Sequence, residues 1–275
     1  GDYEFETDNR KVNINEENKI IYPNLSSIKG FGEGVAETLY RLGNEKYNTF
    51  IDVITALLSN SISKTIVDKL IRINYFKKYG DINTLLSIMS YYDLLYGIKQ
   101  ISKEKAEKNN ISLAVLKEYG HETEKQFNKV DSIGLLNYLI SQIPFKELTL
   151  KETLDNQREI LGIVNIVVPT MNKRIYYVSE LDVKKSIVNI SLYEIYSGKT
   201  RTVKMWTSAY NRDPFSEGSI LYITSLEKKN KKEPTGEVNP KTGKKIYKEV
   251  PDKFEYWLGK FVVKNDVEDG EEDDQ

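Results

Sequence analysis

The sequence predicts an α+β protein in which an all-helical domain is followed by a small five-stranded β-barrel. Apolar residues recur with helical spacing from about residue 31 to about residue 145. Beyond residue 150, short segments rich in Ile, Val, Tyr, Thr and Trp alternate apolar and polar positions, which is typical of strands. A chain of 275 residues is long enough for two domains that each bury a core.

Changes in composition and in hydrophobic periodicity along the chain set the expected boundaries. The first residues are polar with little periodicity, and the last ten, DVEDGEEDDQ, hold seven acidic residues and too few apolar ones to fold. Since the chain begins with Gly1 rather than Met, we expect it to belong to a longer parent protein. The expected divisions are a polar arm (1–18), a helical domain (19–150), the barrel (151–264) and a disordered acidic tail (265–275).

The helical domain is predicted from apolar faces that repeat every three or four residues. Val35, Leu39 and Leu42 share one face of the first predicted helix. An Asp-Ser pair at residues 131–132 is a capping signal that predicts the start of the last helix. The remaining helices are predicted around Phe50, Val53, Ile54, Leu57 and Leu58, around Ile66, Leu70 and Ile73, and over residues 83–97 and 102–120.

The barrel is predicted from period-two alternation. Val188, Ile190 and Leu192 point to one side of their segment, and SGK at residues 197–199 is a plausible hairpin turn. Five short strands favour a small barrel, although an open five-stranded sheet has the same periodicity. The predicted strands are residues 175–182, 187–196, 200–207, 219–226 and 254–263.

Composition excludes several classes of function. The chain has no Cys and one His, His121, which excludes disulfides, thiolate catalysis and zinc sites built from Cys and His. No apolar run approaches the roughly 18 residues that a membrane span needs, and the N-terminus is unlike a signal peptide. We therefore expect a cytoplasmic protein with no membrane partner. The net charge of −1 means that any surface for a polyanion must be local.

Residues 25–39, LSSIKGFGEGVAETL, place three glycines directly before a predicted helix. No Lys-Ser or Lys-Thr follows at the spacing of a phosphate-binding Walker loop, and the third glycine comes too early for a dinucleotide fingerprint. A helix-hairpin-helix turn and an ordinary glycine-rich linker remain open. In the first case the backbone approaches a DNA phosphate without reading sequence, and Ile28 and Phe31 anchor the turn through apolar contacts. The candidate DNA-binding residues are Lys29, Gly30, Phe31, Gly32 and Gly34.

Residues 228–248 hold eight lysines against two glutamates. We expect a long loop between the fourth and fifth strands, with NPKTGKK as a hairpin tip, because Pro and Gly interrupt the segment. A lysine-rich loop can neutralise DNA phosphates, but a solvated loop without function is the simpler alternative. The candidate DNA-binding lysines are Lys228, Lys229, Lys231, Lys232, Lys244 and Lys245.

No catalytic site is expected in this chain. A nucleotidyl-transfer site needs two or three carboxylates that hold Mg²⁺, and no Asp-x-Asp lies in an apolar strand. Glu180 and Asp182 form a pair that lacks a third member, and His121 stands alone in a polar stretch. No cofactor or metal is therefore expected.

The run KIIYPNLSSIKGFGEGVAETLYRL resembles the opening of the helix-hairpin-helix region of bacterial or phage DNA polymerase III alpha subunits. A second run, residues 60–86, is similar to the element that follows in that family, although no second Gly-x-Gly turn lies near Ser61. Residues 187–206 are similar in layout to a strand pair of the OB-fold that comes next in the family. The matching positions are Leu25, Ile28, Lys29, Gly30, Gly32, Glu33 and Ala36 in the first run, and Leu70, Ile71, Phe76, Gly80 and Leu85 in the second.

The resemblance implies an OB-fold for the barrel and a non-catalytic, DNA-binding C-terminal role in a replicative, DNA-directed DNA polymerase. The turn would hold duplex DNA and the barrel a single-stranded template. Tyr193, Lys204 and Trp206 would line one side of that barrel, unless the aromatic rings pack against the helical domain instead. The implied partners are DNA, a sliding clamp and other replisome subunits. A protein-interaction scaffold and an RNA-binding OB-fold are the alternative functions.

Overall fold

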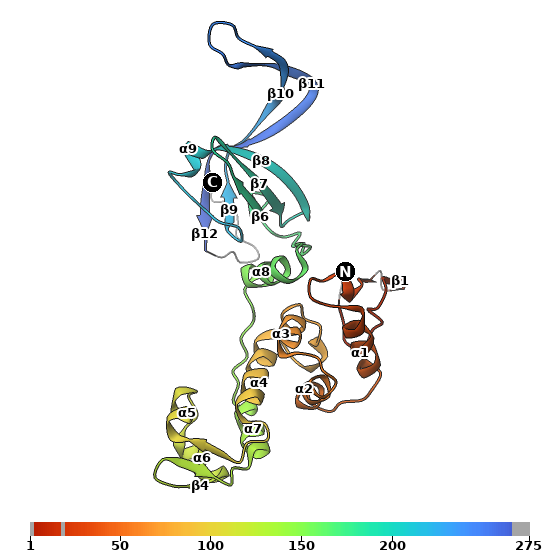
Figure 1. The fold of residues 1–275 in the computed structure, drawn as a ribbon, viewed down its shortest axis with the longest axis vertical. Helices are drawn as coiled ribbons and strands as arrows, with labels where there is room; N and C mark the ends of the chain where they lie inside the picture. The colour runs from red at the N-terminus through yellow and green to blue at the C-terminus, as the bar shows by residue number, and fades with distance from the viewer. Residues whose placement is uncertain (1–2, 18–19, 266–275) are drawn as a thin grey trace. The chain divides into compact units, whose positions relative to one another are not determined.

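The computed structural model describes residues 3–17 and 20–265 (Figure 1). It is a mixed α+β structure that divides into two compact units, Gly1–Leu148 and Thr149–Gln275. The predicted acidic tail lies outside the described residues, apart from Asn265. Within the described ranges, no helix is long and apolar enough to cross a membrane.

The segment expected as a polar arm packs against the helical part of the first unit, to which it belongs. Phe5 is buried, its amide donates to the carbonyl of Tyr75 (3.0 Å), and its ring meets that of Phe76 at 5.3 Å. A Cβ at Gly43 would lie 2.1 Å from the Phe5 carbonyl oxygen, so this close approach requires glycine. Further along, β1 (Asn13–Asn15) pairs antiparallel with β2 (Ile20–Tyr22). Too few apolar residues lie in this segment to reveal such packing from the sequence.

The first helices form as their periodicity predicts. Side-chain caps fix several starts: Thr49 and Asp52 form a reciprocal capping box, and Ser63 and Asp81 cap the next two α-helices. The predicted faces are buried at Leu39, Leu42, Val53, Ile54, Leu57 and Leu70. The elements are η1 (Leu25–Ser27), α1 (Glu33–Gly43), α2 (Phe50–Ser59), α3 (Lys64–Arg72), η2 (Lys77–Tyr79) and α4 (Ile82–Leu95).

The rest of the first unit is not all-helical, which corrects the prediction. The predicted helix 102–120 is broken by a turn at residues 109–112, and three short strands form a sheet in the order β3-β5-β4. Strands of two or three residues are too short to show alternation, so they could not be predicted from the sequence. The elements are β3 (Gln100–Ser102), α5 (Lys103–Lys108), α6 (Leu113–Tyr119), β4 (His121–Glu122), β5 (Gln126–Asn128) and α7 (Ser132–Ser141).

The second unit holds a seven-stranded sheet in the order β10-β11-β8-β7-β6-β9-β12. The prediction of five strands is therefore wrong, and, counted as seven separate strands, the sheet has two open ends, β10 and β12, rather than a closed barrel. A helix, α8, covers one face and begins at a capping box of Thr149 and Glu152. The elements are α8 (Leu150–Leu161), β6 (Ile175–Val183), β7 (Ile187–Glu194), β8 (Lys199–Trp206), α9 (Thr207–Tyr210), β9 (Ile220–Ile223), β10 (Leu226–Val238), β11 (Lys245–Leu258) and β12 (Phe261–Lys264).

Both faces of the central strands are buried. On one face Val188, Ile190 and Leu192 pack together with Val203 and Met205, as the alternation predicts. On the other face, a second cluster brings α8 onto the sheet. Its buried members are Leu154, Met171, Ile175, Tyr177, Tyr193, Ile195 and Ile220.

The lysine-rich segment is not a loop. Residues 226–258 form a long antiparallel hairpin, β10–β11, which extends away from the rest of its sheet in Figure 1. Its register continues through the neighbouring pair, because Leu226 faces Leu258 and Ile223 faces Phe261. Two interruptions, at residues 224–225 and 259–260, separate β9 from β10 and β11 from β12.

Candidate nucleic-acid interface

The glycine turn before α1 depends on Gly30. This residue has φ +92°, in the region that L side chains rarely adopt, while Gly32 (φ −82°) is the residue that begins the helix as its N-cap. Ile28 and Phe31 are buried on either side of Gly30, and the amide of Phe31 donates to the carbonyl of Ile28 (3.0 Å). The predicted apolar anchoring of the turn is confirmed.

Packing does not explain the other two glycines of the turn. A Cβ built on Gly32 or Gly34 would meet no atom within 4 Å, and neither residue has a positive φ. No side chain caps α1, and the amides of Glu33 and Gly34 have no hydrogen-bond partner within the described part of the chain. The start of α1 therefore presents bare backbone donors that an anion can approach closely.

A lysine from α3 completes the turn and was missed by the sequence analysis. The Nζ of Lys69 donates to the carbonyl of Lys29 (3.3 Å), and it would lie 3.6 Å from a Cβ built on Gly30. The exposed Lys29 adds a second ammonium group, against one carboxylate in the first turn of α1, that of Glu33. Periodicity places Lys69 off the core face of its helix, but it cannot show what the side chain meets across 40 residues of sequence.

In the second unit, a pair of tryptophans lies where the hairpin joins the sheet. Trp206, at the end of β8, is 53% exposed, and its ring centroid lies 4.6 Å from that of Trp257, which is 8% exposed. The ammonium of Lys229 lies 5.0 Å from the Trp257 ring. An exposed aromatic face held on a buried ring, next to a cation, is the kind of surface on which a nucleic-acid base stacks.

Two of the residues expected beside Trp206 do not lie free on a barrel face. Tyr193 is 2% exposed, belongs to the cluster under α8, and donates its hydroxyl hydrogen to the carbonyl of Ile166 (2.7 Å). Lys204 is paired with Glu255, whose other carboxylate oxygen accepts from Trp257 Nε1 (2.7 Å). Tyr193 is therefore a core residue, because α8 covers the face it occupies.

The lysines of the hairpin fall into two groups. Those nearer the sheet have partners: Lys229 pairs with Glu227, Lys231 with Glu233 and Lys232 with Glu249. Lys228 instead lies over a ring, 3.7 Å from the centroid of Phe254. The lysines of the outer part, which form no ion pair with another described residue, are Lys241, Lys244, Lys245 and Lys248.

The tip itself is ordered by backbone hydrogen bonds. The amide of Gly243 donates to the carbonyl of Asn239 (2.8 Å), and the amide of Asn239 donates to the carbonyl of Lys244 (2.8 Å). Residues 239–244 therefore form the predicted hairpin tip, and the unpaired ammonium groups cluster around it. Such groups attract phosphate at low ionic strength.

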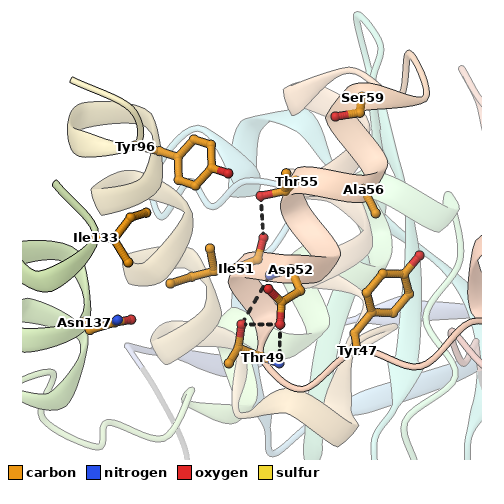
Figure 2. Close-up of a pocket in the computed structure, with 10 residues that line it drawn as sticks. All are labelled: Tyr47, Thr49, Ile51, Asp52, Thr55, Ala56, Ser59, Tyr96, Ile133 and Asn137. Atoms are coloured by element: carbon orange, nitrogen blue, oxygen red, sulfur yellow. Dashed lines mark hydrogen bonds between the residues drawn. The ribbon is translucent and has the colours of Figure 1, made fainter. Parts of the chain in front are cut away.

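A groove of about 460 Å³ in the first unit contains no catalytic arrangement (Figure 2). Its one carboxylate, that of Asp52, is engaged in the α2 cap, where it accepts from the backbone amide (3.0 Å) and hydroxyl (2.9 Å) of Thr49. Burial and the neighbouring Glu45 raise the pKa of Tyr47 to about 12, so its hydroxyl stays protonated. The groove holds no base beside a nucleophile.

The two carboxylates that the sequence analysis singled out do not form a metal centre in the described structure. Glu180 accepts from Ser191 Oγ (3.3 Å), and Asp182 pairs with Lys184 (3.0 Å) rather than with a further acidic residue. Among residues 3–17 and 20–265, no group of three or more His, Cys, Asp or Glu side chains could hold a metal ion. No protein-family model matches the sequence, and no curated protein is significantly similar to it.

Proposed function

We propose that this chain binds DNA, with single strands held by the second unit and the duplex backbone held by the glycine turn. The observation that carries the proposal is the exposed Trp206 at the root of a lysine-rich hairpin. Base stacking on an aromatic side chain is worth about 1–3 kcal/mol per base, and lysines along the strand neutralise phosphates.

We further propose that the second unit is an OB-fold. Support comes from the parallel pairing of β8 with β11, which stands among antiparallel pairings in this sheet. If β9–β10 and β11–β12 each count as one interrupted strand, the pairings run β8-β7-β6-(β9–β10)-(β11–β12) and return to β8. The β10–β11 hairpin is then the loop between the last two strands, which binds oligonucleotides in many OB-folds.

A place in a replicative DNA polymerase rests on the resemblance of residues 19–42 and 60–86 to the DNA polymerase III alpha family. In that setting the parent would supply the nucleotidyl transfer, and a sliding clamp and other replisome subunits would be partners. This chain would position DNA without reacting with it.

The single-strand site is tested by fluorescence anisotropy of the full chain with labelled single-stranded DNA, RNA and duplex. We expect Trp206→Ala to raise the Kd for single-stranded DNA roughly 5–150-fold, the range that corresponds to one lost stacking contact. Lys244→Ala with Lys245→Ala should lower the slope of log K against log salt by about 0.7 per lysine. Changing the same two lysines to Arg keeps the charge and should restore the slope.

Each outcome of this titration has one meaning. A preference for RNA would support the RNA-binding alternative, and no binding to any nucleic acid at low salt would leave the protein-interaction scaffold. Binding that is unchanged in both the tryptophan and the lysine variants would overturn the proposed site.

The glycine turn provides its own matched pair of variants. Gly30→Ala forces a side chain into a left-handed conformation and should cost about 1–2 kcal/mol of stability. Gly32→Ala meets no steric obstacle and should cost about 0.5–1 kcal/mol, because Ala is a poorer N-cap than Gly, and the added methyl group should weaken duplex binding if a phosphate approaches there. Thermal unfolding and duplex anisotropy check the two effects, and normal duplex binding by Gly32→Ala would exclude a phosphate contact at the turn.

A further inference from the structure

The first unit contains a second recognisable arrangement in residues 82–130. Helix α4 is followed by β3, the two short helices α5 and α6, and the hairpin β4–β5, in a sheet of order β3-β5-β4. Figure 1 shows α5, α6 and β4 together at one end of this unit. This succession is a helix-turn-helix whose second helix leads into a two-stranded wing, His121–Asn128.

The turn between the helices has the length that this motif uses. Residues 109–112 connect α5 to α6, and Asn110 adopts φ +58°, a left-handed conformation that Asn tolerates. The amide of Ile111 donates to the carbonyl of Ala106 (2.9 Å), which reverses the chain at the end of α5. Both side chains are buried, and the small Ala106 leaves room for the second helix to pack closely.

One core holds the element in place. Leu116 of α6 and Phe127 of the wing are fully buried in the same cluster as Leu95 of α4. With one side of α6 fixed in this way, its other side carries the exposed residues Ala114, Lys117 and Glu118, and its N-cap residue, Ser112, is also exposed. The exposed side chains at the start of α6 are short, so a ligand can come close to the helix.

The charges around α6 favour a polyanion. Residues 99–129 hold seven lysines against five glutamates. One glutamate, Glu122, pairs with both Lys103 (2.7 Å) and Lys117 (3.0 Å). The exposed lysines that form no ion pair within the described chain are Lys99, Lys105, Lys108, Lys125 and Lys129.

We propose that α6 is a recognition helix that enters the major groove of duplex DNA, with α5 crossing the phosphate backbone and the wing reaching the backbone beside it. In helix-turn-helix proteins the residues at the start of the second helix meet base edges. Lys105 and Lys108 of α5 and Lys125 of the wing would contact phosphates. This site is independent of the single-strand site in the second unit.

The test measures duplex and single-strand binding of the full chain by anisotropy over a salt series. Ala114→Glu places a carboxylate on the exposed side of α6 and should raise the Kd for a mixed-sequence duplex about tenfold or more, while single-strand binding is unchanged. Ser90→Glu is the matched control, because it adds the same charge at an exposed position of α4. Its duplex affinity should equal that of the unmodified chain.

A second variant keeps the test decisive if Ala114→Glu unfolds. Lys105→Ala with Lys108→Ala removes two exposed side chains from α5 without touching the core, and it should lower the salt slope for duplex by about 2. Circular dichroism melting shows whether each variant folds. If folded variants bind duplex as the unmodified chain does, or if the chain binds single strands but no duplex, the proposal is overturned and a protein partner becomes the explanation for the exposed side of α6.

Discussion

The β10–β11 hairpin differs between its root and its outer part, although the same two strands form both. At the root, Leu226 faces Leu258, and the latter is buried in the core of the sheet. Farther out, Val238, Tyr247 and Phe254 are exposed, and lysines occupy both strands. Burial stabilises the root, whereas the outer part is held by backbone hydrogen bonds and cross-strand pairs alone.

This difference indicates what each part contributes. Ordering a residue costs about 1–2 kcal/mol of backbone entropy, and the outer part recovers little of that from apolar burial. The outer hairpin is therefore poorly explained by the stability of the fold. Its lysines and exposed rings are better explained by a ligand. Substitutions at the root and in the outer part therefore distinguish residues that stabilise the fold from residues that bind.

The largest expected contrast is between a leucine in the core of the sheet and a valine in the outer part of the hairpin. Leu192→Ala empties part of the buried cluster and should lower the free energy of unfolding by about 2–5 kcal/mol. Val238→Ala, in the exposed outer part of the hairpin, should change the free energy of unfolding by less than about 0.5 kcal/mol. Both tryptophans belong to the second unit, so their emission during urea unfolding reports on that unit. A large loss of stability in Val238→Ala would show that the outer part of the hairpin contributes to the core.

Strands with a buried face could be predicted from the sequence, whereas the outer part of the β10–β11 hairpin could not. The predicted strands 175–182, 187–196 and 200–207 correspond closely to β6, β7 and β8, because one side of each is apolar. In the outer part of the hairpin, strand formation is locally disfavoured by Pro234, Gly236 and the many lysines. The pairing of β10 with β11 overrides that local preference. Propensity describes single segments, and the hairpin exists only as a pair.

The same limit explains two of the site residues. Alternation placed Tyr193 on the opposite side from Leu192, which is correct, but the sequence analysis did not identify α8 as the cover for that side. The pattern Thr149-x-x-Glu152 is a capping-box signal that could have predicted α8. Lys69 had no such signal, because its position beside Gly30 depends on how α3 packs.

A smaller contrast separates packing from binding at two tyrosines. Tyr193→Phe removes the hydroxyl that donates to Ile166 and should cost about 1 kcal/mol of stability without changing the Kd for single-stranded DNA. Burial raises the pKa of Tyr193, so the donor stays protonated at neutral pH. Tyr247→Phe, in the exposed outer part of the hairpin, should leave stability unchanged. Weaker DNA binding by a stable Tyr193→Phe chain would return this residue to the interface.

The smallest expected effect concerns Glu255 at the root, where the two parts of the hairpin meet. Burial opposes its ionisation, but hydrogen bonds from Lys204 and Trp257 outweigh burial and hold the pKa of Glu255 below its ordinary value of 4.5. A carboxylate whose pKa is lowered by folding contributes its full stabilisation at pH values above the ordinary pKa. The contribution is lost as the pH falls through the lower pKa of the folded state.

Glu255→Gln keeps the shape of the side chain and removes this acid-sensitive part. The stability of the unmodified chain should therefore fall more steeply than that of the variant when the pH drops below 4.5. At neutral pH the variant lacks a negative charge at Trp257, the ring that contacts Trp206, and its Kd for single-stranded DNA should fall about twofold, an effect of about 0.5 kcal/mol. Tryptophan-monitored unfolding at several pH values and anisotropy at neutral pH measure the two effects. If the variant loses the acid-dependent part of its stability but binds single-stranded DNA with unchanged affinity, Glu255 stabilises the root and has no influence on the binding surface. The surface that binds DNA would then lie farther from Glu255 than Trp206 does.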